Sequence, residues 1–199
     1  IVVRLVGSEM CIRDSLSAAR PDISITLSSQ VCPEIREYER QSTACANAYV
    51  QPLMSRYLTK LDEALQSMGF MCPFLLMTSG GGLTTLDTSI KFPVRLVESG
   101  PAGGAILATE IAKECGIDNV LSFDMGGTTA KICLIDDYTP QMTRTFEVAR
   151  VYRNLKGSRL PLRIPAIEMV EIGAGGGSIA KVDEMKRISV GPELSLIHI

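Results

Sequence analysis

A turn rich in glycine and hydroxyl side chains lies between two apolar runs in the middle of the chain. It reads Asp124-Met125-Gly126-Gly127-Thr128-Thr129, and the apolar runs cover residues 120–123 and 132–135. Glycine allows backbone N–H groups to approach an anion closely, and threonine adds hydroxyl donors. An aspartate carboxylate holds Mg²⁺ directly or through a water molecule. These residue types suit a phosphate group and its metal ion, so nucleotide binding is the leading hypothesis.

Three further glycine clusters accompany this turn. Ser99-Gly100-Pro101-Ala102-Gly103-Gly104 precedes a predicted helix, whose free N–H groups and dipole favour a phosphate or a ribose. A tight strand-to-helix turn explains the same residues. Gly173-Ala174-Gly175-Gly176-Gly177-Ser178 follows a predicted strand, and three consecutive glycines indicate the close approach of a ligand or of another backbone. Ser79-Gly80-Gly81-Gly82 fits a flexible active-site loop and a plain linker equally well.

Two common phosphate-binding designs are absent from the sequence. There is no G-x-x-x-x-G-K-[ST] segment, and no G-x-G-x-x-G turn with an acidic residue about 20 positions later. What remains is a strand, the Asp-x-Gly-Gly-Thr-Thr turn and a second strand. The actin, sugar kinase and Hsp70 superfamily uses such hairpins, one from each of two domains, to grip the phosphates of ATP. An ordinary structural hairpin is the alternative explanation.

The elements that position these turns can be outlined from periodicity. A strand is predicted over residues 22–28, a loop over 28–33, and helix from about Glu34, with Pro52 starting a second helical segment or kinking the first. Gly69 suits the position after the last helical turn. The apolar residues of this helix are spaced by three and four and predict its buried face: Val50, Met54, Tyr57, Leu61, Leu65 and Met68.

The rest of the chain reads as strands with one more helix. The helix is predicted over residues 102–115 with Gly116 past its end, and a hairpin is predicted over 179–190 around Asp183-Glu184. Residues 136–140 are expected to form a turn. These elements predict an α/β fold with a mixed sheet. Further strands are predicted over residues 74–77, 94–97, 120–123, 132–135, 143–152 and 162–172.

Composition narrows the class of protein. The 199 residues are 46% hydrophobic, enough for one sizeable core in one or two domains, and the net charge of −2 gives no general attraction to nucleic acid or to an anionic membrane. No apolar stretch is long enough to span a membrane. No C-x-x-C pair occurs and the single histidine is His198, so a zinc site is not expected. The six cysteines are interpreted as small buried thiols in a reducing cytoplasm.

Both ends of the chain differ in character from the middle. Residues 1–15 show neither helical nor strand periodicity, and residues 194–199 follow abruptly after Gly191-Pro192-Glu193. We expect both ends to be non-native read-through, with ordinary frayed termini as the alternative. Residues 16–193 are expected to form one partial ATPase-like domain.

Five strings together resemble the hydantoinase A/5-oxoprolinase family, which includes N-methylhydantoinases and acetone carboxylase-type subunits. They occur in the family's order, and the likeness covers about residues 18–193. Taken together they are far more specific than any one turn. The strings are Glu39-Arg40 with Asn47-Ala48-Tyr49, Ser79-Gly80-Gly81-Gly82-Leu83, Glu98-Ser99-Gly100-Pro101-Ala102-Gly103-Gly104, Phe123-Asp124-Met125-Gly126-Gly127-Thr128-Thr129 and Ile172-Gly173-Ala174-Gly175-Gly176-Gly177-Ser178.

The resemblance implies an actin-like ATPase fold and the ATP-dependent opening of a cyclic amide such as 5-oxoproline or a hydantoin. It also implies Mg²⁺ and a hydantoinase B-type partner subunit or domain. Gly126, Gly127, Thr128 and Thr129 would contact the β- and γ-phosphates, and Thr128 would act in catalysis. Asp124 would hold Mg²⁺, directly or through water, or orient the attacking water. The clusters 99–104 and 173–178 would line the nucleotide.

Two departures from the family pattern bear on this assignment. Many members carry Asp where this chain has Lys131, and the lysine either reaches a phosphate oxygen or is simply solvated. The family's first phosphate motif does not occur in the sequence, so we expect this piece alone to be inactive. Two alternatives remain open: an ATP-consuming carboxylase subunit of the acetone carboxylase type, and a non-catalytic ATP-binding module.

Overall fold

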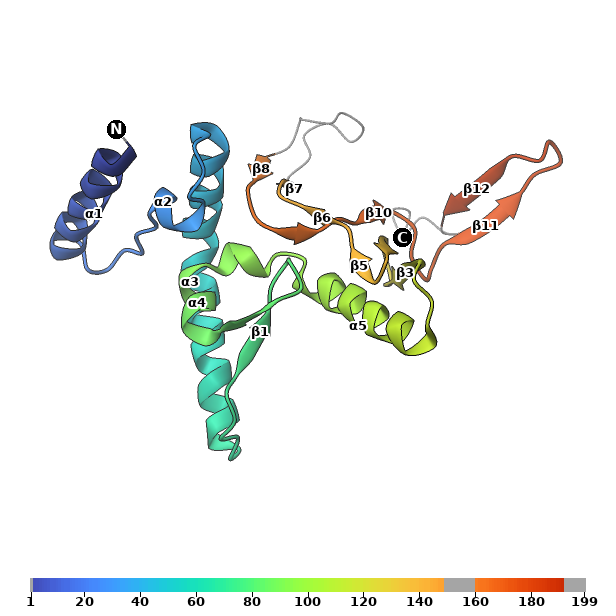
Figure 1. The fold of residues 1–199 in the computed structure, drawn as a ribbon, viewed down its shortest axis with the longest axis horizontal. Coiled ribbons are helices and arrows are strands. Elements are labelled where there is room, and N and C mark those ends of the chain that lie inside the picture. The colour runs from blue at the N-terminus through green and yellow to red at the C-terminus, as the bar shows by residue number, and fades with distance from the viewer. Residues whose placement is uncertain (1, 149–159, 192–199) are drawn as a thin grey trace, which may run out of the picture. The chain divides into compact units, whose positions relative to one another are not determined.

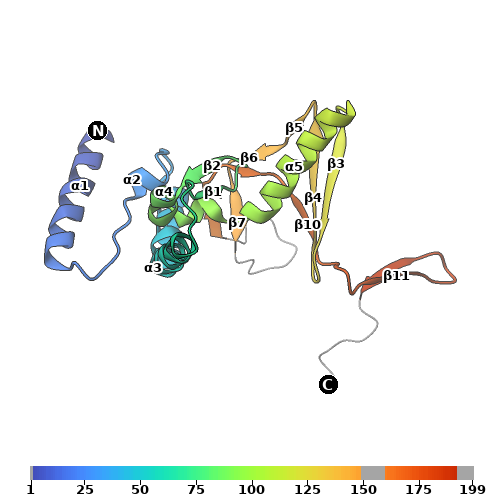
Figure 2. The ribbon, with the colours of Figure 1, turned by 90° about the horizontal axis from the view of Figure 1, so that it is seen from below.

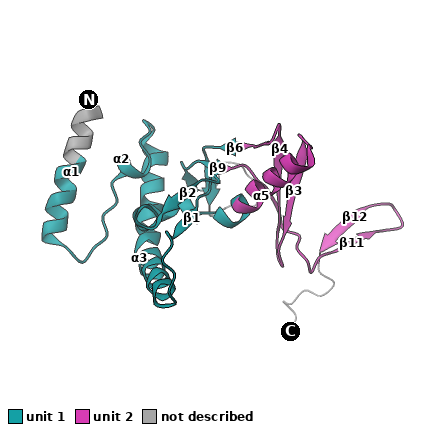
Figure 3. Ribbon diagram, turned by 60° about the horizontal axis from the view of Figure 1, so that its bottom comes forward, with its two compact units in different colours: residues 1–102, 142–166 teal, residues 103–141, 167–199 magenta. Residues whose placement is uncertain are grey.

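The chain folds into two compact α/β units. A computed structural model describes residues 2–148 and 160–191, and side chains from Glu9 onward. Unit 1 comprises residues 1–102 and 142–166, and unit 2 comprises residues 103–141 and 167–199 (Figure 3). No helix in the described part of the chain has the length and apolarity needed to cross a membrane.

Unit 1 is built on one long helix, α3 (Glu37–Ser67), which contains Pro52 (Figure 1). The helix continues through this proline, so Pro52 does not start a second helical segment. The helix ends as expected. Gly69 has a φ of +88° and donates to the Gln66 carbonyl at 3.0 Å, while Phe70 donates to the Leu65 carbonyl at 3.1 Å. This glycine-capped end satisfies two terminal carbonyls.

The buried face of α3 is largely the one predicted, since Val50, Met54, Leu61 and Leu65 are half-buried. Tyr57 and Met68 are exposed, whereas Leu58 is only 1% exposed. The N-terminal half of the face is polar: Thr43 and Asn47 are fully buried. Hydrophobic spacing was wrong at Tyr57 and Met68, and it missed the continuation of the face through Thr43 and Asn47 because it does not count polar residues.

Asn47 connects α3 to neighbouring segments through hydrogen bonds of its side chain. Its side-chain amide donates to the Lys91 carbonyl at 3.1 Å and to the Thr26 hydroxyl at 3.2 Å, and its side-chain oxygen accepts from the Val94 N–H at 3.3 Å. Buried polar atoms must be paired to be tolerated. Asn47 therefore sets where α4 (Leu86–Lys91) and the 3₁₀ helix η1 (Pro93–Leu96) meet α3.

Unit 1 contains further elements and a small apolar core. They are helix α1 (Val2–Ala19), helix α2 (Ser28–Val31), and strands β1 (Leu75–Met77), β2 (Leu83–Thr85), β6 (Met142–Thr143), β7 (Phe146–Val148) and β8 (Leu160–Leu162). β1 pairs with β2 and β7 with β8, both antiparallel. The core consists of Val31, Val94, Leu162 and Ile164.

Unit 2 contains a four-stranded antiparallel sheet in the order β10-β4-β3, with β5 also paired to β4. Helix α5 (Ser99–Cys115) lies alongside β3 and β4 (Figure 2). It buries a stripe of small residues that includes Ala105, Thr109 and Ala112, and it ends at Gly116, whose φ is +68°. The strands are β3 (Val120–Met125), β4 (Ala130–Asp136), β5 (Thr139–Pro140) and β10 (Val170–Ile172).

Two turns in unit 2 match their sequence signals. Asp137 and Tyr138 have φ values of 46° and 56°, the two positive values that a tight two-residue hairpin turn requires, and they join β4 to β5. Strands β11 (Ile179–Val182) and β12 (Ile188–Gly191) form the predicted hairpin. At its tip, the N–H and the guanidinium of Arg187 lower the pKa of the Asp183 carboxyl. β9 (Ala166–Ile167) pairs with β6.

Several predicted elements differ in the structure. Residues 22–27 have no strand partner, and the loop predicted from residue 28 begins with the short helix α2. Residues 94–96 belong to η1 and form no strand, because Pro93 starts a helical turn that the Arg95 N–H closes onto the Phe92 carbonyl at 3.0 Å. Of the strand predicted over 143–152, residues 149–152 lie outside the described residues.

The cysteine prediction holds for two of the six residues. Cys32 and Cys133 are buried, and burial raises the pKa of each thiol, so both stay neutral. The other four cysteines are exposed: Cys11, Cys45, Cys72 and Cys115.

Candidate functional site

The β3–β4 hairpin presents the central Gly-Gly-Thr-Thr turn at its tip. Six residue pairs align the two strands, from Val120 opposite Ile135 to Met125 opposite Ala130. The Gly126 N–H donates to the Thr129 carbonyl at 2.9 Å and closes the turn. Gly126, Gly127 and Thr128 are exposed, as a surface that binds a ligand requires, and Thr129 is half-buried. The predicted strand–turn–strand unit is confirmed.

Strand β10 brings a second glycine cluster to this tip. It pairs antiparallel with β4, and its last residue, Ile172, lies opposite Ala130, the first residue of β4. The chain therefore leaves the sheet beside the hairpin turn, and residues 173–178 fold over it. The Gly176 N–H donates to the Gly126 carbonyl at 2.9 Å, which joins the two clusters directly.

Gly175 makes the closest approach between the two clusters. A Cβ atom placed on Gly175 would lie 2.5 Å from the carbonyl carbon of Gly127 and 2.5 Å from the Thr128 nitrogen. No side chain fits at such distances, so glycine is required here by backbone-to-backbone contact. Gly177, two residues later, has nothing within 4 Å of the same position.

Ser178 shapes the second cluster. Its hydroxyl accepts from the Gly175 N–H at 3.1 Å, and its own N–H donates to the Gly175 carbonyl at 2.8 Å. These two bonds close residues 175–178 into a compact turn against the hairpin. The sequence indicated a ligand or another backbone next to this cluster, and the structure shows another backbone.

A row of charges crosses the sheet one residue below the turn. The register places Lys131 opposite Asp124 on one side and opposite Glu171 on the other. Directly paired residues of neighbouring antiparallel strands point to the same face, so the lysine lies between two carboxylates. The sequence allowed Lys131 to reach a phosphate or to be solvated, and the register adds carboxylate neighbours that were not foreseen.

The assignment of Asp124 to Mg²⁺ stays a prediction. Among the described residues, no group of three or more His, Cys, Asp or Glu side chains gathers as metal ligands. Mg²⁺ is usually held by one or two carboxylates together with substrate phosphates and waters. A single exposed carboxylate next to the Gly-Gly-Thr-Thr turn fits that pattern.

The cluster at residues 99–104 differs from its prediction in one respect. It forms the first turns of α5 and does not precede the helix. Glu98, just before it, adopts a φ of 60°, which turns the chain sharply into the helix, and the Ala102 N–H donates to the Glu98 carbonyl at 3.1 Å. The prediction that Ser99, Gly100, Gly103 and Gly104 contact a nucleotide stays a prediction.

The cluster at residues 79–82 is a fixed turn in unit 1. Ser79 is 2% exposed, and its N–H and hydroxyl both donate to the Arg95 carbonyl, at 2.8 and 2.7 Å. Gly81 has a φ of +79°, a conformation that favours glycine. Neither a flexible loop nor a plain linker describes this turn. Sequence reasoning also missed the arginines near it, because residues 95, 144 and 163 are too far apart to form a recognisable spacing.

Comparison with known proteins gives consistent matches. The family model described as Hydantoinase/oxoprolinase matches residues 40–198. The alpha subunit of the caprolactamase of Pseudomonas jessenii is 35% identical over 175 residues, which cover 88% of this chain and 24% of that protein. The chain spans about a quarter of the length of the curated relatives it matches first.

Solved structures agree. The crystal structure of the ATP-dependent caprolactamase from Pseudomonas jessenii matches with a TM-score of 0.74 and 34% identity, over 96% of this chain and 26% of that one. A nucleotide-free acetone carboxylase structure matches with a TM-score of 0.70 and 25% identity, over 94% and 26%. The chain is thus part of an actin-like ATPase-type α/β fold, as the sequence predicted.

Proposed function

Because this chain belongs to the hydantoinase/oxoprolinase family, we propose that it forms part of an ATP-dependent enzyme that opens a cyclic amide, such as 5-oxoproline or a hydantoin. The observation that carries the proposal is the junction of residues 126–129 with 173–178, where two glycine clusters meet at one exposed hairpin tip. Relatives named for ATP-dependent amide hydrolysis support it.

The residues at the tip take defined roles in this proposal. The N–H of Gly127 and the hydroxyls of Thr128 and Thr129 bind the β- and γ-phosphates, and Gly126, whose N–H donates to the Thr129 carbonyl, shapes the turn. Asp124 orients the attacking water or holds Mg²⁺, which would neutralise phosphate charge when bound. We assign residues 99–104 and 173–178 to the nucleotide's surroundings, and the glycines of 173–178 keep the tip in shape.

The chemistry follows from the weakness of an amide as an electrophile. The γ-phosphoryl group passes from ATP to the amide carbonyl oxygen, and ADP leaves. Water then attacks the activated carbon, the ring C–N bond breaks, and phosphate is released. The other product is the ring-opened acid, an amino acid from 5-oxoproline or an N-carbamoyl amino acid from a hydantoin. The protein contributes mainly positioning and charge stabilisation.

Partners and location complete the proposal. The Pseudomonas jessenii relative is named as one subunit of its enzyme, and we propose a hydantoinase B-type subunit or domain as the partner here. The cytoplasm is the proposed location, since its reducing conditions keep exposed thiols free. By itself, the 199-residue chain is expected to be inactive.

The first test replaces Thr128 with alanine in the full-length protein. Loss of the hydroxyl should lower amide-stimulated phosphate release on the order of 10²-fold, because a hydrogen-bond donor to the transferred phosphoryl group is lost. Thr59→Ala, an exposed change on α3, is the matched control and should leave the rate unchanged. Near-normal turnover in Thr128→Ala would refute the phosphate assignment.

A second candidate function is an ATP-consuming carboxylase subunit, which the likeness to acetone carboxylase favours. The same phosphate-release measurement separates the two. Stimulation by 5-oxoproline or a hydantoin supports the amidase, whereas stimulation only by a ketone with bicarbonate supports the carboxylase. ATP binding without stimulated turnover identifies a non-catalytic ATP-binding module.

A further inference from the structure

Unit 1 contains a cavity of about 590 Å³ that lies outside the phosphate-binding turns. A volume of that size suits a small organic ligand. It is formed by the end of α2, the β1–β2 turn, η1 and the segments on either side of β7 and β8. All its lining residues belong to unit 1: Val31, Cys32, Pro33, Glu34, Thr78, Gly80, Leu83, Thr84, Arg95, Arg144, Arg163, Ile164 and Pro165.

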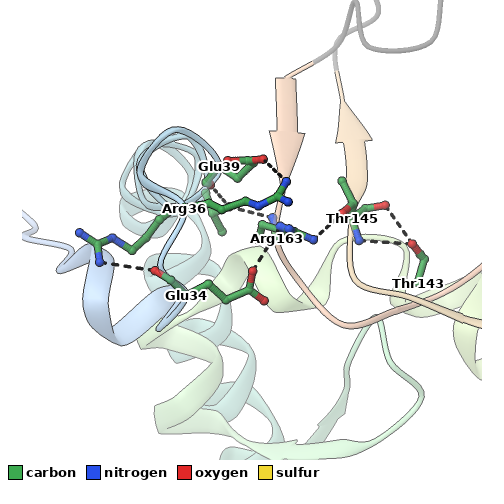
Figure 4. A network of polar contacts seen from close by, with 8 residues as sticks. Glu34, Arg36, Glu39, Thr143, Thr145 and Arg163 are labelled. Atoms are coloured by element: carbon green, nitrogen blue, oxygen red, sulfur yellow. Dashed lines mark hydrogen bonds and ion pairs between the residues drawn. The ribbon is translucent and has the colours of Figure 1, made fainter. Parts of the chain in front are cut away.

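Three guanidinium groups and one carboxylate belong to this lining. The Arg163 Nε atom is buried and lies 3.2 Å from a carboxylate oxygen of Glu34, without hydrogen-bond geometry (Figure 4). Arg163 also donates to the Thr145 hydroxyl at 2.9 Å, and its backbone N–H donates to the Thr43 hydroxyl at 2.8 Å. Arg163 is thus held in place from three sides.

Arg95 and Arg144 leave the cavity with an excess of positive charge. Neither forms an ion pair with a carboxylate among the described residues. Arg95 stacks on the Phe92 ring at 4.7 Å, and Arg144 is exposed. Burial raises the pKa of the Cys32 thiol, so the cysteine adds no negative charge. With Glu34 offset by Arg163, the charges of Arg95 and Arg144 are not balanced by any carboxylate in the part of the chain that the structure describes.

The other lining groups suit a carboxylate ligand with a carbon skeleton. Five of them are apolar and suit a carbon skeleton: Val31, Pro33, Leu83, Ile164 and Pro165. Two N–H groups of the adjacent glycine turn are already used, since the Ser79 N–H donates to the Arg95 carbonyl and the Gly81 N–H to the Thr78 carbonyl at 2.9 Å. A phosphate cradle needs such N–H groups to be free. The planar guanidinium fork matches a carboxylate in two bonds.

We propose that this cavity is a binding site for a small dicarboxylate, with Arg95 and Arg144 each engaging one carboxylate and the apolar residues enclosing the chain between them. The ion pair between Arg163 and Glu34 forms part of the wall of the site and holds it in place. The inference does not depend on the phosphate assignment in unit 2, because every lining residue belongs to unit 1.

Calorimetric titration of the full-length protein with glutarate, without nucleotide, tests the proposal. Arg144→Gln should weaken glutarate binding about tenfold, since a charge-assisted hydrogen bond is lost. Arg56→Gln, an exposed arginine on α3 that bonds to the Pro52 carbonyl, is the matched control and should bind as wild type. Arg95→Gln is the second variant and should weaken binding to a similar extent.

Three outcomes would overturn the dicarboxylate site. They are equal binding by Arg144→Gln and wild type, equal binding of neutral glutaramide and glutarate, and tighter binding of inorganic phosphate than of glutarate. Thr128→Ala should keep full glutarate binding, so a failure here is distinguishable from a failure of the proposed ATP chemistry. Thermal melting of each variant confirms that the substitutions leave the fold intact.

Discussion

Gly175 shows how one residue without a side chain holds the candidate site together. Its backbone rests directly on that of Gly127 and Thr128, at the turn where we place the phosphates. The contact couples a loop and a hairpin that lie almost 50 residues apart in sequence. Any side chain at this point must push the hairpin tip away from its present position.

Gly175→Ala is therefore expected to abolish ATP turnover and to destabilise the fold by about 1–3 kcal/mol, the usual cost of overpacking. Phosphate release and thermal melting are the measurements. Gly191→Ala serves as the control, because nothing lies within 4 Å of its added methyl group and it belongs to none of the glycine clusters. Equal activity in the two variants would contradict the packing role assigned to Gly175.

At the scale of single residues, the sequence predicted only part of the candidate site. The residue types of 124–129 were enough to predict a hairpin turn, because glycine and threonine have local conformational signatures. The contact between Gly175 and Gly127 was not readable, since it depends on the pairing of β10 with β4. For the same reason the position of Lys131 between Asp124 and Glu171 appeared only with the register.

Among the elements, α3 illustrates how polar residues organise packing. A helix in this region was predictable from its periodicity, and so was its glycine-capped end. Most of its buried face was predicted, but the continuation of that face through Thr43 and Asn47 was not, because hydrophobic spacing does not count polar residues. Both use their side chains to hold backbone groups of other segments.

Asn47→Ala should lower the free energy of unfolding by about 1–3 kcal/mol, because the Val94 N–H and the Lys91 carbonyl lose a buried partner. Denaturant unfolding measures the change. Asn119→Ala is the control, since Asn119 is exposed and its side chain bonds to the neighbouring Asp118. A loss equal to that of the control would contradict the role of Asn47.

For the molecule as a whole, one face of the unit 2 sheet stands out as apolar and uncovered. Alternation puts the buried Cys133 and Ile135 on the opposite face. An exposed apolar surface of this kind marks a region of association. Its exposed members come from three strands: Leu121, Phe123, Met125, Leu134, Val170 and Ile172.

The 199-residue chain on its own should consequently self-associate as its concentration rises. Light scattering after size-exclusion chromatography measures the mass. Replacing Phe123 and Leu134 with lysine should reduce the association, whereas Leu107→Lys on the exposed side of α5 should not. A chain that stays monomeric at every concentration would refute the role of this face.

The family and the fold class were predictable at the scale of the whole chain, because five motifs in a fixed order carry more information than any single turn. The division into two units was not predicted. No linker of distinct composition marks the boundary between the units, because each unit is assembled from segments that are far apart in the sequence.

The pairing of β3 with β4 also restricts how this protein can change in length. Six aligned pairs place Asp124 on the face of Lys131 and the buried Cys133, and place Phe123 on the other. Inserting one residue within β4 would exchange the two faces beyond that point, since side chains alternate. Inserting two would restore them. Insertions or deletions inside β4 are thus tolerable only when they add or remove an even number of residues. The turn between residues 136 and 139 lies at the other end of β4 from the phosphate-binding turn, so this restriction does not apply to it.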